Sequence, residues 1–278
     1  MKQRRRLGLP SPLWCEPLAK ALQGQEAFEL LRDSTMHHAL RLREQSIHAA
    51  FLSPIDYARE SSFYRIVPGV AVSSRGGNNS AVLHFRQGVR TFDTLAVDPT
   101  SVSEIILARV ILAEEFDVEA KIVPVEGPLE EKLRRADAAL LMGDEALREM
   151  TRQGNMLDLV EVWSELTELP YVHGFWCTWE GELTIEEARL LGTHGTPDDQ
   201  LLDTIASEAA VQHNLPDLAT TTVREYLGSF SYEFDAQVEE GIREFLTFAF
   251  YHGVLPDVPE LNYLSSESPD ETADGPSL

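Results

Sequence analysis

The sequence is short of cysteine and of long apolar stretches. Cys15 and Cys177 are the only cysteines in its 278 residues, which rules out a disulfide framework, and no Cys or His spacing is typical of structural zinc. No apolar run approaches the ~20 residues that a membrane-spanning helix needs. The basic start, residues 1–6, is followed by a segment too short and too rich in proline for a secretory signal. These absences predict a cytoplasmic protein.

Positive charge is also scarce. The chain has 23 Lys and Arg residues against 46 Asp and Glu residues, a formal net charge of −23. This charge argues against nucleic acid and against an anionic membrane surface as partners, since both require positive patches. It would also repel a small anion, so an anionic ligand needs hydrogen-bond donors aimed at it locally. Residues 265–278 are acidic and rich in Pro and Ser, and we expect them to form a disordered tail.

The chain does contain an alternating series of apolar strands and amphipathic helices. Its 43% hydrophobic and 25% charged residues are ordinary for a globular protein, and its length allows a large core. After about residue 184 the pattern changes to long helices, at 185–213 with a break near 193–195, at 223–228 and at 236–252. The predicted strands are 5–10, 27–31, 47–52, 64–72, 80–85, 95–97, 120–125, 138–142, 157–160 and 171–179.

This alternation predicts an α/β fold of two lobes, with the second lobe inserted into the first. We expect residues 1–88 and 180–264 to form lobe 1 and residues 89–179 to form lobe 2. The chain is expected to cross between the lobes near residues 80–91 and 171–179. A ligand cleft between the lobes follows from this arrangement.

The stretch 92–115 is the βα unit around which this prediction is organised. Residues 95–97 form a short buried strand, and Thr100, Ser101 and Ser103 then crowd the start of an apolar-periodic helix. Hydroxyl side chains at a helix start can satisfy its free backbone N–H groups. They can also turn those groups, and the positive end of the helix dipole, toward an anion. The sequence leaves both roles open.

Polar residues also follow other predicted strands. Ligands of open α/β lobes bind at the carboxyl ends of strands, beside helix N-termini. We therefore expect these strand ends to form the two faces of one cleft for a small anionic ligand. They are Ser11, Ser53, the loop 73–80, residues 100–103 and the pair Gly143-Asp144.

Seven motifs, in a fixed order and spacing, carry a resemblance to a known family. They are SPIDYA (53–58), YRIVPGVAVSS (64–74), SAVLHF (80–85), LAVDPTSVS (95–103), ADAALLMGDEAL (136–147), DLVEVWSELTELPYVHGFW (158–176) and EYLGSFSYEFD (225–235). Over about residues 5–256, the chain resembles the chorismate dehydratases of the futalosine route to menaquinone. The dihydroxynaphthoate synthases of the same route fit these motifs less well.

The resemblance implies the two-lobed fold of type 2 periplasmic binding proteins. It also implies a lyase that eliminates water from chorismate to give 3-[(1-carboxyvinyl)oxy]benzoate, with no metal or redox cofactor. Ser80 falls on the family's active-site serine. Thr100, Ser101 and Ser103 fall on its carboxylate-binding helix start, and the pair 143–144 matches a Gly-Asp pair at the cleft. We expect a monomer or a homodimer.

One position departs from the family. Where the family has the active-site asparagine of a Tyr-Leu-Asn-Ser-x-Pro-Leu pattern, this chain has Trp14, with Pro17 and Leu18 in register. An indole donates one hydrogen bond, accepts none, and is far bulkier than a carboxamide. Two functions therefore remain: the lyase, and a catalytically degenerate cytosolic binding or sensing module for a small aromatic carboxylate.

Ser80 is the predicted catalytic residue, although it could simply begin a strand. Asn79 is a turn residue that could replace the missing amide. His173 lies on an apolar strand, where a histidine satisfied within the core is the alternative to a site role, and Asp144 is suited to capping its helix. The predicted ligand-binding residues are Ser11, Trp14, Ser53, Asn79, Thr100, Ser101, Ser103, Asp144 and His173.

Overall fold

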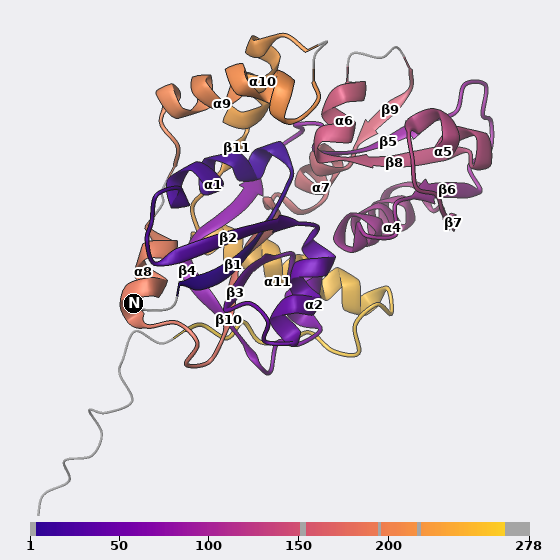
Figure 1. Cartoon of the computed structure of the whole chain (residues 1–278). Coiled ribbons are helices and arrows are strands. Elements are labelled where there is room, and N and C mark those ends of the chain that lie inside the picture. Colours follow the sequence, from indigo (N-terminus) through magenta and orange to yellow (C-terminus); the bar gives the residue numbers. More distant parts are fainter. Residues whose placement is uncertain (1–3, 151–153, 194–195, 216–217, 265–278) are drawn as a thin grey trace, which may run out of the picture.

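The computed structural model of the chain describes residues 4–150, 154–193, 196–215 and 218–264. Within them the chain forms two β-sheets, each covered by helices (Figure 1). The predicted tail, 265–278, lies outside the described residues. In the part of the chain that is described, no helix is long and apolar enough to cross a membrane.

The first lobe is built on a six-stranded sheet. Its strands are β1 (Arg5–Pro10), β2 (Phe28–Asp33), β3 (Ala49–Leu52), β4 (Tyr64–Ser74), β10 (Tyr171–Trp179) and β11 (Phe230–Ser231). Their order in the sheet is β11–β4–β10–β3–β1–β2. β1, β2 and β3 run parallel, and β10 lies antiparallel between β3 and β4. The parallel strands place three carboxyl ends at one edge of the sheet.

The second lobe is built on a five-stranded sheet. Its strands are β5 (Ala81–Phe85), β6 (Thr94–Val97), β7 (Lys121–Pro124), β8 (Ala138–Met142) and β9 (Met156–Asp158). Their order is β7–β6–β8–β5–β9, with β6 parallel to its two neighbours and β5 antiparallel to β8 and β9. β6 and β8 therefore end at the same edge, where the helices that follow them begin.

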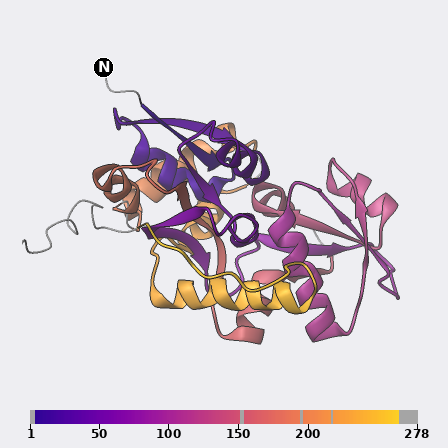
Figure 2. The same cartoon turned by 90° about the horizontal axis from the view of Figure 1, so that it is seen from below.

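The helices cover both sheets. They are η1 (Leu13–Cys15), α1 (Glu16–Leu22), α2 (Thr35–Arg43), α3 (Pro54–Ala58), α4 (Val102–Phe116), α5 (Leu129–Arg135), α6 (Gly143–Glu149), α7 (Leu159–Thr167), α8 (Ile185–Gly192), α9 (Asp199–Gln212), α10 (Thr220–Gly228) and α11 (Ala236–Tyr251). Side-chain caps define several starts: Ser34 caps α2, Ser53 caps α3 and Asp235 caps α11. α11, the long yellow helix in Figure 2, contacts both β10 and α4, so it touches both lobes.

The chain passes between the two sheets twice. It leaves the first sheet after β4, enters the second at β5, and returns through α7 to β10. By sheet membership, β5 therefore joins the second lobe and β10 the first, whereas the expected domain limits at 88/89 and 179/180 would place each in the other lobe. Both strands are buried along nearly their whole length. Because neither shows a polar face, their sequences carry no signal of which sheet they join.

α7 begins earlier than the sequence predicted. Residues 157–160 were expected to be extended, but the strand ends at Asp158. The Asp158 carboxylate accepts hydrogen bonds from the N–H groups of Val160 and Glu161, at 2.9 and 3.3 Å, and this cap starts the helix at Leu159. The two-residue strand β11 was not predicted.

Candidate ligand site between the two lobes

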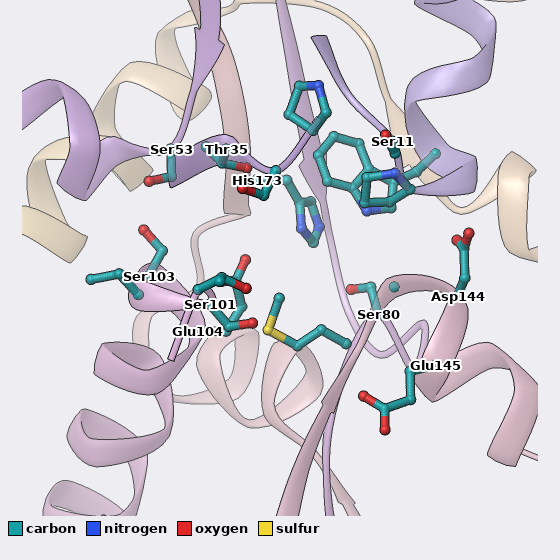
Figure 3. Close-up of a pocket in the computed structure, with 18 of the residues that line it drawn as sticks. Ser11, Thr35, Ser53, Ser80, Ser101, Ser103, Glu104, Asp144, Glu145 and His173 are labelled. Carbon is teal, nitrogen blue, oxygen red and sulfur yellow. The ribbon is translucent and has the colours of Figure 1, made fainter. Parts of the chain in front are cut away.

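A cavity of about 570 Å³ lies between the two sheets and is lined from both (Figure 3). The first lobe supplies the carboxyl ends of β1, β2 and β3. The second lobe supplies the start of α4 and the turn from β8 into α6. The volume falls within the ~300–1,000 Å³ range of small-molecule sites. The cavity lies where the strand ends predicted a cleft.

The structure brings all but one of the predicted site residues to this cavity. The exception is Asn79, which does not line it and has a positive φ of 57°. The Asn79 N–H donates to Asp158 Oδ2 at 2.6 Å, so its backbone joins the loop before β5 to the N-cap residue of α7. Ligand contacts of the others stay predictions. The predicted residues that line the cavity are Ser11, Trp14, Ser53, Ser80, Thr100, Ser101, Ser103, Asp144 and His173.

The hydroxyl side chains at the start of α4 do not cap it. Ser101 is the N-cap residue, but its side chain makes no capping bond. Thr100 Oγ1 donates to Asp98 Oδ1 at 2.7 Å, and Ser103 Oγ is buried with no partner in the described chain. Of the two roles that the sequence left open, capping is therefore wrong. Apart from the Glu104 N–H, which bonds to its own carboxylate, the first N–H groups of α4, its dipole and two hydroxyl groups remain available at the cavity.

The Ser103→Ala variant is expected to bind a benzoate analogue more weakly, by about 1–3 kcal/mol, the usual worth of a hydrogen bond to a charged group. Its free energy of unfolding should change little, because the hydroxyl has no partner to lose in the described chain. Isothermal titration and urea unfolding measure the two quantities. Ser73→Ala is the matched control, since Ser73 Oγ is likewise buried and unpartnered among the described residues but lies outside the cavity lining. Equal affinities of the two variants would contradict the anion role.

A hydrogen-bonded series of four residues runs from Ser80 through Asn78 and Ser74 to His173. The Oγ and the N–H of Ser80 both lie close to Asn78 Oδ1, at 2.6 and 3.0 Å. Because a backbone N–H can only donate, the Asn78 atom facing it is the oxygen, and Asn78 Nδ2 donates to Ser74 Oγ at 2.7 Å. Ser74 Oγ is also hydrogen-bonded to His173 Nε2, 2.9 Å away.

The direction of the hydrogen bond from Ser80 to Asn78 decides what Ser80 offers to a ligand in the cavity. Ser80 Oγ donates its hydrogen bond to Asn78 Oδ1, so toward the cavity it accepts a hydrogen bond from a ligand hydroxyl. His173 is neutral, because burial lowers its pKa to about 3. Both alternatives for His173 hold in part, since it is satisfied by Ser74 within the core and it also lines the cavity.

Trp14 forms an apolar wall of the cavity. It is only 7% exposed, and its ring centroid lies 5.4 Å from that of His173 and 6.3 Å from those of Phe51 and Phe230. Tyr232 Oη donates to its backbone carbonyl at 2.8 Å. The indole thus belongs to the core of the first lobe and reaches the cavity with only a small exposed part.

The cavity is unusually acidic for an anion site. Arg32 is the one Lys or Arg in its lining; Nη2 donates to Glu16 Oε1 at 2.7 Å, and Nε is buried without a partner in the described chain. No group of three or more His, Cys, Asp or Glu side chains among the described residues could hold a metal ion. A bound dianion would therefore depend on dipoles and hydroxyl groups more than on cations. The lining acids are Asp33, Asp56, Glu104, Asp144 and Glu145.

The chain is similar to known proteins over nearly its whole length. A family model described as menaquinone biosynthesis matches residues 6–251. The chain belongs to this menaquinone biosynthesis family. The resemblance drawn from the seven motifs is thereby confirmed at the level of the family.

Solved structures show that this family member has a periplasmic-binding-protein-like fold, as expected. Protein AF1704 from Archaeoglobus fulgidus is 16% identical, with a TM-score of 0.68 over 91% of this chain and 98% of that one. The alkanesulfonate-binding protein SsuA from Xanthomonas axonopodis pv. citri, bound to MOPS, is 12% identical, with a TM-score of 0.62 over 94% and 96%. A Candida albicans protein with the generic periplasmic binding protein fold is 11% identical, with a TM-score of 0.55 over 97% and 100%. At these identities the likeness concerns the fold alone.

In this family member a hydrogen-bonded latch joins the two lobes beside the cavity. Asp144, in the first turn of α6, accepts from the Leu13 N–H at 2.8 Å and contacts His213 Nδ1 at 2.7 Å, and both partners belong to the first lobe. His213 Nε2 lies 3.5 Å from Glu16 Oε1. Burial alone would lower the pKa of His213, but its bonds to Asp144 and Glu16 outweigh burial and raise it to about 9. Both Asp144 oxygens are thus engaged by protein, where the sequence suggested a ligand or a helix cap.

The latch predicts a pH dependence of stability. Because its folded-state pKa is raised, His213 contributes stability that is fully present below its ordinary pKa of about 6.5 and lost as the pH rises through about 9. Between pH 6 and pH 10 the parent should lose about 1–3 kcal/mol of unfolding free energy that His213→Gln does not lose. Urea unfolding at both pH values measures the difference. His37→Gln is the control, because His37 pairs with Asp33 at an exposed site. The same pH dependence in parent and His213→Gln would contradict the latch.

Sequence reasoning missed Glu104, Asp56 and Arg32 as lining residues. The spacing of Ser101 and Glu104 is that of a capping box, in which the acid bonds to the N-cap backbone N–H, and this pattern hides a site role. The Ser101 N–H instead donates to the carbonyl of Asp98, at 3.1 Å. The only sequence signal for Glu104 was its place directly after the helix-start hydroxyl groups.

Proposed function

We propose that the protein is a dehydratase that eliminates water from chorismate to give 3-[(1-carboxyvinyl)oxy]benzoate. One observation carries the proposal: the cavity sets the uncapped start of α4 opposite Ser80, in a chain of the menaquinone biosynthesis family. Figure 3 shows Ser101 and Ser103 on one side of the cavity and Ser80 on the other. The hydrogen-bond donors at the start of α4 suit a carboxylate at one end of a substrate, and Ser80, as an acceptor, suits a hydroxyl at the other end.

The start of α4 is suited to the ring carboxylate of the substrate. Loss of a ring proton moves negative charge into that carboxylate, and N–H groups and hydroxyl groups held in place stabilise charge as it develops. Ser101 and Ser103 supply the hydroxyl groups. Ser80, as an acceptor, orients the ring hydroxyl that departs, and Trp14 covers a face of the ring.

Incubation of the purified chain with chorismate, followed by chromatography, tests the proposal. The expected result is a product that absorbs as an aromatic ring and coelutes with synthetic 3-[(1-carboxyvinyl)oxy]benzoate. Chorismate recovered unchanged at the rate of a protein-free control would overturn it. A cytoplasmic location and a monomer or homodimer complete the proposal, and cell fractionation and light scattering test them.

The second candidate is a binding or sensing module that keeps the cavity without the chemistry. Trp14 in place of a carboxamide, and five acids around a site for an anion, favour it. Such a module would bind a small aromatic carboxylate, measured by titration, and would not turn over chorismate. The first function is preferred because Ser80 and the start of α4 are both in place.

A further inference from the structure

The latch of Asp144 and His213 lies where the second lobe closes over the ligand cavity. The Asp144 carboxylate reaches the first lobe at the Leu13 N–H, 2.8 Å away, and at His213 Nδ1, 2.7 Å away. One residue earlier, Gly143 comes so near to the first lobe that an added Cβ would lie 3.3 Å from Pro12 Cβ. Pro12, Gly143 and Asp144 all line the cavity, so the latch and the residues beside it form one of its walls.

Two further residues of α6 complete this contact between the lobes. Leu147, nearly one turn after Asp144, is buried in the apolar cluster of the first lobe. Arg148 Nε donates to the carbonyl of Asn214 at 3.3 Å. Residues three and four apart lie on one face of a helix, so Asp144, Leu147 and Arg148 share the face of α6 that meets the first lobe. The contact thus consists of one buried apolar side chain and several polar groups.

Elsewhere the two lobes are joined by a continuous apolar core. One cluster of buried residues includes Leu83 of β5 and Phe175 of β10, from different sheets. Within it, Trp163 of α7 packs edge-on against Phe245 and Phe248 of α11, with ring centroids 5.7 Å apart. Separating the lobes there would expose many apolar side chains to water, whereas opening the latch exposes one leucine. The lobes therefore part most readily at the latch.

The latch joins a cation to two carboxylates near neutral pH. His213 is the C-cap residue of α9, where the helix dipole favours positive charge. Burial lowers its pKa, but Asp144 on α6 and Glu16 on α1 outweigh burial and raise it to about 9. Behind Glu16, Arg32 of β2 pairs with it at 2.7 Å. The other titratable groups near Asp144, whose pKa values burial raises well above their ordinary range, are Cys15 of η1 and Tyr226 of α10.

We propose that His213 is a positioning residue, which acts through Asp144 to hold the second lobe closed over the cavity, so that a ligand enters and leaves only as the latch opens. His213 does not line the cavity, so its effect on a ligand passes through Asp144. The proposal goes beyond the proposed function, because it applies equally to a dehydratase and to a binding module. Opening of such a closed site sets the rate of ligand exchange.

The first test needs no ligand and uses NMR hydrogen exchange of two backbone amides at pH 7. The Leu13 N–H bridges the lobes, whereas the Gly143 N–H donates to the Ser80 carbonyl within the second lobe, at 2.8 Å. His213→Gln should lower the protection of the Leu13 amide about 10- to 100-fold and leave that of the Gly143 amide as in the parent. Unchanged protection of Leu13 would overturn the proposal. Equal losses at both amides would also overturn it, because the start of α6 would then be fraying.

His252→Gln is the matched control. Like His213, His252 is the C-cap residue of a helix and joins the lobes through an acid, Glu114 at 2.8 Å, but it does not line the cavity or contact α6. This variant should keep the parent's protection at Leu13. A loss equal to that of His213→Gln would mean that any contact between the lobes has this effect, which would overturn the specific role of His213.

The second test follows the exchange of benzoate between the free and bound states by NMR line shape. Because the raised pKa makes the latch strongest below about 6.5 and weakens it as the pH rises through about 9, the parent should exchange benzoate about tenfold faster at pH 10 than at pH 7. His213→Gln should exchange it at the faster rate at both pH values. The association and dissociation rate constants should rise together, so that Kd changes little.

The ratio of the two rate constants separates positioning from damage to the site. A variant whose dissociation rate constant alone rises has lost binding groups, and this result would overturn the proposal, as would a parent whose exchange does not depend on pH. Neither test uses chorismate. A chain that fails to turn over chorismate but shows both expected results would therefore overturn the dehydratase function and leave the role of His213 standing.

Discussion

Replacing Ser80 by alanine is expected to lower kcat/KM for chorismate by about 100- to 1,000-fold, the usual cost of removing one preorganised polar group from an active site. Ser80 Oγ donates a hydrogen bond to Asn78 Oδ1, so toward the substrate it acts as a hydrogen-bond acceptor. Without it, the departing hydroxyl loses the partner that holds it in line for protonation. Folding should be little affected, because Asn78 Oδ1 keeps its bond from the Ser80 N–H at 3.0 Å. Steady-state kinetics and urea unfolding measure the two effects.

Ser73→Ala again supplies the matched control. Ser73 is a buried serine of β4 outside the cavity lining, and its variant should keep the parent's kcat/KM. If Ser80→Ala also kept it, Ser80 would be only the residue that precedes β5. The hydrogen bonds from Ser80 to His173 would then be structural.

Replacing Trp14 by alanine is expected to lower the free energy of unfolding by about 3–5 kcal/mol, the usual cost of emptying a buried aromatic site. The indole packs against Phe51, His173 and Phe230, and an alanine side chain is too short to keep these contacts. Urea unfolding measures the loss. Phe63→Ala is the control, because Phe63 is 54% exposed and its variant should lose far less. Equal losses would mean that Trp14 is not a core residue.

Trp14→Asn addresses the two candidate functions directly. It should lose as much stability as the alanine variant, because a carboxamide in this apolar wall is also poorly solvated. On the dehydratase proposal the parent already turns over chorismate, and the variant is no faster per folded molecule. A variant that gained turnover which the parent lacks would favour the degenerate binding module. Product chromatography, normalised to the folded fraction, separates these results.

The sequence by itself determined the elements and the family. The predicted bounds of β1, β8 and β10 match the structure because each is a mostly buried run ended by Pro, Gly or a change to polar residues, which are local signals. The motifs predicted the family and the two-lobed fold. The rule that ligands bind at strand ends also led to the cavity, since chain order alone shows which residues follow a strand.

Only the tertiary structure decided what the site residues do. Asp144 contacts Leu13, 131 residues away, and the hydrogen bonds that run from Ser80 to His173 include one between Ser74 and His173, 99 residues apart. Glu104 has a capping-box spacing in the sequence, yet in the fold it is a cavity acid with a pKa of about 7. Hydrogen-bond partners and burial are set by residues distant in the chain, so local patterns do not encode them. For this reason the sequence predicted where the cavity lies, whereas packing of the two lobes determined its charge and its proton donors.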